Sequence, residues 1–393
     1  MPRMWLKRGR ETAIKGGYLW VHSSDIQRIS NSARDGQVVD ILDSKGRLLG
    51  RGLLNRPSPI VARIFSRRRE EWDETLLVQR IRLAMDRRRR WGIDLHACRI
   101  VFGESDGVPG LVMDRYGPVA VFQIHHPAVE RLRRPLIRFL AQELQVQSIF
   151  DRSDTGVRAQ EGLPPSSGLV WGDPPDDLWI TEDGVRLKVD VVQGQKTGHY
   201  LDQKKNRVRL GPLGQGRRVL DLFCYTGGFG LHALAGGASS VTFVDSSGPA
   251  LRILKENLEH AGWTGRASLI QANAFDLLRS LERRGESFDL ICMDPPAFAT
   301  SARSVSSASR GYKELNLRAL KLLPTGGILL SSSCSSHMPV GLHLQLIAEA
   351  AADAGKEVIL IEQWHQDLDH PVVPAHAPSR YLKCHVLEVV GQS

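Results

Sequence analysis

Cysteine is scarce in this chain: there are five among 393 residues, and no two are spaced as C-x-x-C. An odd number of scattered cysteines argues against both a disulfide framework and a zinc site. Long apolar runs are also missing, since no stretch approaches the roughly 18 residues that span a bilayer. The first residues, MPRMWLKRGRETAIKGG, contain no apolar segment of the secretory kind. We therefore expect a cytoplasmic protein with no metal and no membrane partner.

Acidic residues are fewer than basic ones, with 43 Asp and Glu against 52 Lys and Arg and a net charge of +9. This excess favours a polyanionic partner such as nucleic acid, although a basic enzyme without such a partner is also compatible with it. Part of the excess lies in an expected amphipathic helix within residues 67–99, at Arg87, Arg88, Arg89 and Arg90. This run either contacts RNA phosphates or forms a solvated helix face.

Three regions with different patterns follow one another along the chain. Residues 1–74 are rich in glycine and β-branched residues, with a hairpin signal at 44–46, and predict a small β-rich module. Residues 75–180 combine the basic helix with short strands and a further helix from 128, and end in a proline- and glycine-rich connection at 164–177. Residues 181–393 alternate strands and helices, which predicts an α/β domain with a mostly parallel, doubly wound sheet. A final antiparallel hairpin is expected from 356–364 and 381–390.

In the α/β domain, the segment VLDLFCYTGGFGLHALA predicts a buried strand, a glycine turn and the start of a helix. Glycines at a helix amino terminus form a pocket for a nucleotide-like ligand, and Asp245 at the end of the next strand suits a ribose. The turn lacks the G-x-G-x-x-G of dinucleotide folds, and Asp221 just before it suits the ammonium group of an amino acid. S-adenosylmethionine joins an amino acid to an adenosine, so we expect this cofactor, with a nicotinamide cofactor as the alternative.

Two more strand ends carry reactive groups. Asp294 begins the segment DPPAF at the carboxyl end of an apolar strand, where such sheets hold their active sites, although a plain strand-ending turn is the alternative. Cys334 ends the next strand within LLSSSCSSHM and should face the same cleft, although a lone cysteine is more often inert core than a nucleophile. A thiolate there could add to C6 of a pyrimidine and make C5 nucleophilic enough to take a methyl group, while Asp294 holds N3. The sequence does not identify the general base that removes the C5 proton.

At these residues the chain resembles the ribosomal large subunit methyltransferase I family, which are PUA-containing 23S rRNA cytosine-C5 methyltransferases. The resemblance covers almost the whole length. GGYLWVHSSDI and GQVVDILDSKGRLLGRGLLN are similar to the family's PUA module, and VFGESDGVPGLVMDRYG and DRSDTGVRAQEGL to its middle domain. GQKTGHYLDQKKNR, DLFCYTGGFG, DPPAF, RGYKELNLRAL and SSSCS are similar to its catalytic domain. The resemblance implies a Rossmann-like class I methyltransferase domain after a PUA domain, Cys334 as the nucleophile, and a role in rRNA processing during ribosome biogenesis.

The motifs together with the resemblance indicate which residues bind the cofactor, whereas the DPPAF segment and the arginine run indicate the residues that contact RNA. The cofactor set comprises Asp221, Phe223, Cys224, Tyr225, Thr226, Gly227, Gly228, Asp245, Ser246, Asn273, Ala274, Phe275, Gln195, Lys196, Tyr200, Asp202 and Arg207. The RNA set comprises Pro295, Pro296, Phe298 and the four arginines from Arg87 to Arg90. Asn273 stands where the family usually has an aspartate for the adenine amino group, and its carbonyl oxygen can accept the same hydrogen bond.

Three functions remain open at this point. The first is a cytosine-C5 rRNA methyltransferase. The second is an RNA methyltransferase that acts on a base nitrogen and needs no thiol, because D-P-P-[FY] also occurs in such enzymes. The third is a non-catalytic RNA-binding or assembly factor. The sequence leaves open which nucleotide is methylated, whether naked 23S rRNA or an assembling subunit is the substrate, and whether the protein forms a homodimer.

Overall fold

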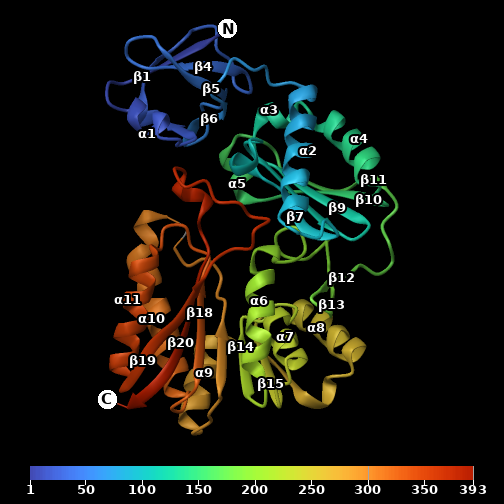
Figure 1. The fold of residues 1–393 in the computed structure, drawn as a ribbon, viewed down its shortest axis with the longest axis vertical. Helices are drawn as coiled ribbons and strands as arrows, with labels where there is room; N and C mark the ends of the chain where they lie inside the picture. Colours follow the sequence, from blue (N-terminus) through green and yellow to red (C-terminus); the bar gives the residue numbers. More distant parts are fainter. Residues whose placement is uncertain (300, 393) are drawn as a thin grey trace. The chain divides into compact units, whose positions relative to one another are not determined.

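Two units make up the chain in the computed structural model, which describes residues 1–299 and 301–392 (Figure 1). The first unit comprises Met1–Ile180, Val189–Leu201 and Leu368–Ser379. The second comprises Thr181–Lys188, Asp202–Asp367 and the chain from Arg380 onward. The segments 189–201 and 368–379 therefore belong to the first unit, although the sequence pattern assigns them to the α/β domain. The three-domain division stays a prediction.

The amino-terminal part of the first unit is a six-stranded sheet in the order β2-β6-β5-β4-β1-β3. Its elements are β1 (Arg3–Leu6), α1 (Glu11–Lys15), β2 (Trp20–His22), β3 (Ile26–Ile29), β4 (Val38–Leu42), β5 (Leu48–Leu54) and β6 (Ile60–Ser66). Strands β4 and β5 pair antiparallel, which confirms the predicted hairpin, and Gly46 takes a left-handed φ of 79° in its turn. Met4, Leu6 and Ile41 are fully buried in the core of this sheet.

A five-stranded sheet in the order β11-β10-β9-β8-β7 follows in the same unit. The strands are β7 (Ala97–Phe102), β8 (Leu111–Tyr116), β9 (Val119–Ile124), β10 (Ser148–Ser153) and β11 (Ser166–Gly172). The helices are α2 (Glu74–Arg90), α3 (Pro127–Glu130), α4 (Arg133–Glu143) and α5 (Gly156–Gln160). Asp73 caps α2 by accepting the Leu76 N–H, and the α2 side chains Leu77 and Ile81 are buried against the sheet.

Two expectations for this region were wrong. The segment 164–177 is not only a connection, because its short apolar run forms β11 and pairs antiparallel with β10. The flanking prolines and glycines hide this strand in the sequence. The helix expected from 128 is instead divided into α3 and α4.

The second unit contains a seven-stranded sheet in the order β16-β15-β14-β17-β18-β20-β19. Its strands are β14 (Arg218–Leu222), β15 (Ser240–Asp245), β16 (Ala267–Gln271), β17 (Leu290–Met293), β18 (Ile328–Ser333), β19 (Lys356–Trp364) and β20 (Lys383–Gln392). A separate two-stranded ribbon joins β12 (Trp179–Glu182) to β13 (Val185–Lys188). Strands β14 to β18 pair in parallel, whereas β20 runs antiparallel to both of its neighbours, β18 and β19. This confirms the predicted doubly wound sheet and its final hairpin.

Six helices accompany this sheet: α6 (Lys204–Leu210), α7 (Gly228–Ala235), α8 (Gly248–Ala261), α9 (Ala274–Arg283), α10 (Val305–Lys321) and α11 (Val340–Asp353). Helix α11 was not predicted from the sequence. Helices α10 and α11 lie side by side next to β18–β20, and α6 and α7 lie together next to β14 and β15 (Figure 1). Every residue of β17 and β18 is buried, so this layered core fixes where both strands end.

Among the described residues, no helix is both long and apolar enough to cross a membrane.

Candidate active site

Carboxylates and a thiol gather where the parallel strands of the second unit end. Asp221 lies in β14, Asp245 ends β15, Asp294 directly follows β17, and Cys334 directly follows β18. Strands β17 and β18 are parallel neighbours, with Met293 opposite Ser331, so their carboxyl ends meet at one sheet edge. The structure therefore brings the two predicted catalytic residues to adjacent strand ends.

The three aspartates interact through their charges. The pKa of Asp221 is raised to about 7, chiefly by burial and also by the charges of Asp294 and Asp245, while the hydrogen bond from the Gly230 N–H opposes the rise. Both carboxylate oxygens of Asp245 accept backbone N–H groups, from Tyr225 and Ser247, each at 2.8 Å. Such a concentration of negative charge is complementary to a cationic ligand.

The loop after β14 takes a backbone path that L-residues rarely adopt. Phe223 and Tyr225 have positive φ values of 60° and 49°, and Gly227 precedes α7 with a φ of 88°. A Cβ atom on Gly227 would lie 2.2 Å from Leu254 Cδ1, so this position requires glycine. Within the same loop, the buried Thr226 Oγ1 has no hydrogen-bond partner among the described residues.

These features fit the expected S-adenosylmethionine, whose ammonium and sulfonium groups are cationic. The acidic strand ends would hold the cationic portion, and the loop at the start of α7 offers the unpartnered Thr226 hydroxyl as a further polar group. Asn273 caps α9, since its Oδ1 accepts the Phe275 N–H at 2.9 Å, and the amide side chain is exposed. No cluster of three or more metal-ligating side chains occurs in the described parts of the chain.

Cys334 is the half-buried member of the five cysteines, whereas Cys98, Cys224, Cys292 and Cys384 are buried. Burial also raises the pKa of the Cys224, Cys292 and Cys384 thiols, so these three stay protonated at neutral pH. A thiol needs access and ionisation to react. Cys334 is therefore the cysteine that the fold leaves accessible.

The serines on either side of Cys334 are fixed by hydrogen bonds. The Ser335 N–H donates to Ser333 Oγ (3.3 Å), and Ser333 Oγ donates to the Tyr312 hydroxyl (2.8 Å). The Tyr312 hydroxyl lies 3.1 Å from Ser335 Oγ, which also accepts the Ala299 N–H at 3.1 Å. This ring of bonds holds the backbone before and after the thiol and joins it to the segment that follows Asp294.

Tyr312, on α10, lies within electrostatic reach of both reactive groups. Burial raises the pKa of its hydroxyl, the hydrogen bonds with Ser333 and Ser335 oppose that rise, and the charges of Cys334 and Asp294 add to it. The Tyr312 ring also packs against Phe298, with 5.0 Å between centroids, and Phe298 in turn lies 6.3 Å from the Phe275 ring. Phe298 and Phe275, expected to bind RNA and cofactor respectively, thus belong to one aromatic group.

The remaining residues of the predicted cofactor set fall into two groups. Asp202 and Arg207 belong to the second unit, where Tyr381 donates to Asp202 at 2.6 Å and Arg207 forms two hydrogen bonds with the buried Glu182, at 2.9 and 2.6 Å. Gln195, Lys196 and Tyr200 belong to the first unit. Within it, Tyr200 donates to Gln195, and the Lys196 ammonium lies 4.2 Å from the Tyr200 ring centroid. Their contribution to cofactor binding stays a prediction.

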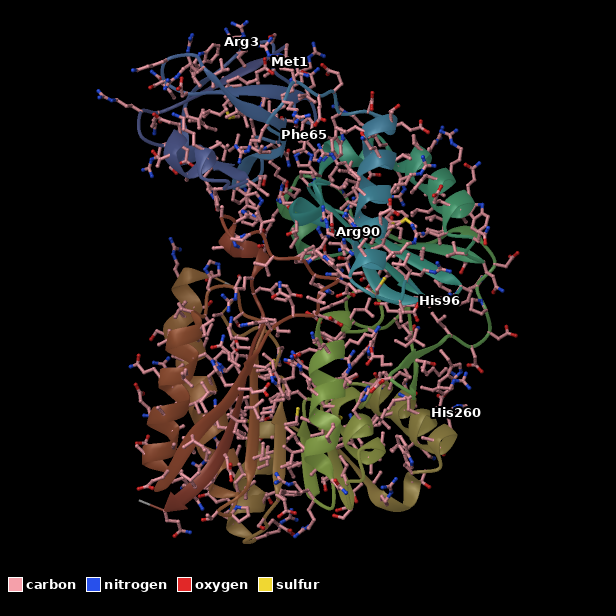
Figure 2. All side chains as sticks on the ribbon, in the orientation of Figure 1. Met1, Arg3, Phe65, Arg90, His96 and His260 are labelled. Carbon is pink, nitrogen blue, oxygen red and sulfur yellow. The ribbon has the colours of Figure 1, made fainter. Side chains whose placement is uncertain are left out.

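The predicted RNA set needs one correction. The Arg88 side chain is completely buried and pairs with both carboxylate oxygens of Asp106, at 2.6 and 2.8 Å, so it braces the first unit and cannot reach a phosphate. The sequence reveals a run of arginines but not which one turns inward. Arg87 also pairs with Asp106, Arg89 pairs with Asp86, and Arg90 is exposed at the end of α2 (Figure 2). Pro295 is buried and Pro296 exposed.

Sequence reasoning missed two residues beside the thiol, Tyr312 and Lys383. Tyr312 stands in the segment RGYKELNLRAL, which the resemblance assigns to the catalytic domain without giving it a role. Lys383 is the first residue of β20, whose first five residues are all buried, and its exposed fraction is 3%. A lysine is rarely buried without a partner, so a lysine inside an apolar strand was the available signal.

Comparisons with known proteins agree with this geometry. A family model described as S-adenosylmethionine-dependent methyltransferase matches residues 117–386, and a PUA-like domain model matches residues 4–67. Ribosomal RNA large subunit methyltransferase I from Serratia proteamaculans (strain 568) is 42% identical over 388 residues, which cover 97% of this chain and 98% of the relative. Its namesake from Yersinia pestis bv. Antiqua (strain Angola) is 41% identical with the same coverage.

Solved structures show the same fold. SMU.776, solved in complex with SAH, superposes with a TM-score of 0.87 over 99% of this chain and 100% of that one, at 23% identity. Trm5b from Pyrococcus abyssi superposes with a TM-score of 0.53 over 71% of this chain and 75% of that one, at 20% identity. The chain belongs to the ribosomal RNA large subunit methyltransferase I family of S-adenosylmethionine-dependent methyltransferases.

Proposed function

We propose that this protein transfers the methyl group of S-adenosylmethionine to carbon 5 of a cytosine in 23S ribosomal RNA, with Cys334 as a covalent nucleophile. The observation that carries the proposal is the accessible thiol at the end of β18, beside the strand end that holds Asp294. The RNA class comes from the relatives, which are named as methyltransferases of large-subunit ribosomal RNA. The excess of nine basic residues is consistent with such a substrate.

The thiol is needed because carbon 5 of cytosine is a weak nucleophile. The Cys334 thiolate forms a bond to carbon 6, and the electron pair of the C5–C6 double bond becomes available at carbon 5. S-adenosylmethionine would supply the methyl group: its sulfonium–methyl bond breaks as the methyl carbon bonds to carbon 5, and S-adenosylhomocysteine is the leaving group. A base then removes the proton from carbon 5, the C5–C6 double bond re-forms, and the C6–S bond breaks to release the thiolate.

The neighbouring side chains would assist this sequence in defined ways. Asp294 would hold ring nitrogen 3 and stabilise the charge that moves onto the ring when the sulfur adds. The Ser333–Tyr312–Ser335 ring of hydrogen bonds would keep the thiol in one position while a flat base approaches. Phe298 and Pro296, half-buried and exposed respectively, offer apolar surface beside Asp294 for a base that has left its helix.

The test is bisulfite sequencing of 23S rRNA from a strain that lacks the protein and is complemented with variants. Wild type should restore one protected cytosine, and Cys334→Ala should not, although calorimetry should show that Cys334→Ala still binds S-adenosylhomocysteine. Cys292→Ala is the matched control, because it removes a buried thiol from the neighbouring strand and should retain methylation.

A covalent trap gives a second measurement. RNA with 5-fluorocytosine at the target has no proton at carbon 5 to remove, so the protein–RNA adduct should persist on a denaturing gel with wild type and be absent with Cys334→Ala. Full methylation by Cys334→Ala would overturn the proposal in favour of transfer to a base nitrogen. RNA binding without any heat of S-adenosylmethionine binding would instead favour an assembly factor.

A further inference from the structure

A buried lysine lies beside the thiol. Lys383 begins β20 and pairs across the antiparallel ladder with Ser333, the residue before Cys334. Its ammonium donates hydrogen bonds to the carbonyl oxygens of Ser335, the residue after Cys334, and of Tyr381, the latter at 3.0 Å. Lys383 therefore contacts the chain on both sides of the proposed nucleophile while being only 3% exposed.

We propose that Lys383 places its ammonium beside Cys334 so that the sulfur is held as a thiolate before the RNA base arrives. This inference rests on the proposed function, since it assigns a positioning residue to the same reaction. An ammonium has three N–H donors, and the two carbonyl bonds leave the third for the sulfur. A positive charge next to a thiol stabilises its ionised form. The thiol proton passes to water, and Lys383 keeps its own proton.

Lys383 supplies the positive charge near Cys334 at neutral pH, because the two nearby imidazoles are uncharged. Burial lowers the pKa of Lys383 to about 8, against the opposing charges of Cys334 and Cys384, so the side chain remains mostly protonated at pH 7. The two nearby imidazoles are neutral there, because burial lowers the pKa of His343 to about 3 and of His385 to about 4. Tyr312 stays protonated, and Asp294 opposes a second negative charge.

Because the other four cysteines are buried, the ionisation of the Cys334 thiol can be measured separately by alkylation. Alkylation by iodoacetamide, followed by mass spectrometry of the Cys334 peptide between pH 5.5 and 9.5, reports the fraction of thiolate without RNA or cofactor. In wild type we expect the midpoint at least about one unit below the ordinary thiol value of about 8.5. A wild-type midpoint at or above that value would overturn the inference without any variant.

Three substitutions separate charge from hydrogen bonding. Lys383→Gln retains an N–H donor without charge and should raise the midpoint by about one unit or more, which lowers the alkylation rate at pH 7 about tenfold. Lys383→Arg keeps the charge and should stay closer to wild type. Lys313→Met removes a half-buried lysine of α10 that pairs with Asp353, and it should leave the midpoint unchanged. The proposed role of Lys383 would be refuted if wild type and Lys383→Gln had the same alkylation midpoint. It would also be refuted if Lys383→Gln and Lys383→Arg shifted that midpoint equally.

This test and that of the proposed function fail separately. If Cys334→Ala methylates normally, the covalent mechanism is wrong whatever the alkylation midpoints show. If Cys334→Ala is inactive but Lys383→Gln leaves the midpoint in place, the covalent mechanism stands and Lys383 has no part in thiol ionisation. The acid limb of the pH profile of kcat should move with the alkylation midpoint in Lys383→Gln.

Discussion

Arg207 offers the sharpest test of how this fold supports its cofactor loop. Its guanidinium is 3% exposed and forms two hydrogen bonds with Glu182, which is fully buried. Replacing Arg207 by Met leaves a buried carboxylate without its charge partner, a change that costs about 3–5 kcal/mol of unfolding free energy. With an m-value of about 3 kcal/mol per molar urea, the unfolding midpoint should fall by about 1–1.7 M.

The second substitution, Glu182→Leu, completes a double-mutant cycle. Removing both charges should recover most of the lost stability, because apolar residues can replace a buried ion pair at little cost. Circular dichroism and tryptophan fluorescence in urea would measure all four proteins. A double variant no more stable than Arg207→Met would refute the reasoning.

The same double variant shows whether Arg207 only supports the fold by pairing with Glu182, as a brace, or binds the cofactor directly. The structure places Arg207 on Glu182, and Gly228 at the start of α7 packs against its side chain, since a Cβ there would lie 2.5 Å from Arg207 Cδ. A brace predicts that the double variant binds S-adenosylhomocysteine nearly as wild type does. A direct charged hydrogen bond to the cofactor, worth about 1.5–3 kcal/mol, predicts a loss of affinity of about tenfold or more.

Three further predictions follow from single positions. Arg88→Met should destabilise the first unit by about 3–5 kcal/mol because Asp106 loses its buried partner. Arg90→Gln, at the exposed end of α2, should leave the stability in urea unchanged. If Arg90 contacts RNA, this variant should reduce by about 1 the slope of log affinity for RNA against log salt concentration. Gly227→Ala should abolish cofactor binding in calorimetry because its Cβ meets Leu254, while Gly262→Ala, at a similar positive φ with nothing within 4 Å, should keep the affinity and lose only about 1 kcal/mol of stability. The raised Asp221 pKa of about 7 means that the protonated carboxyl stabilises the fold: this contribution is complete below pH about 4 and is lost as the pH rises through about 7. The free energy of unfolding, measured in urea, should therefore decrease between pH about 4 and pH about 7 in wild type, and this decrease should be smaller in Asp221→Asn. The same decrease in both proteins would contradict the prediction.

The sequence predicted what depends on local pattern and missed what depends on packing. Strand–helix alternation was enough to predict a mostly parallel, doubly wound sheet, and the strand ends at Asp294 and Cys334 were visible as polar residues after apolar runs. Strand β11 was missed because its pairing with β10, rather than its own composition, makes it a strand. The inward turn of Arg88 was likewise not readable, since it depends on Asp106, which lies outside its own helix. For Lys383 the sequence offered a lysine in an apolar segment as a signal, but not its partner Ser335, which is distant in sequence.

The serines around Cys334 show how packing gives a local pattern its meaning. In the sequence they are small side chains that leave room for a base. In the structure, Ser333 and Ser335 are buried, and their hydroxyls bond to Tyr312, so they fix the thiol rather than only making space. A cysteine at either serine position would be buried like the other four and hindered from ionising. The accessible residue between them is thus the one place in this strand end where a thiol can combine a fixed position with ionisation, which is what addition to a pyrimidine ring requires.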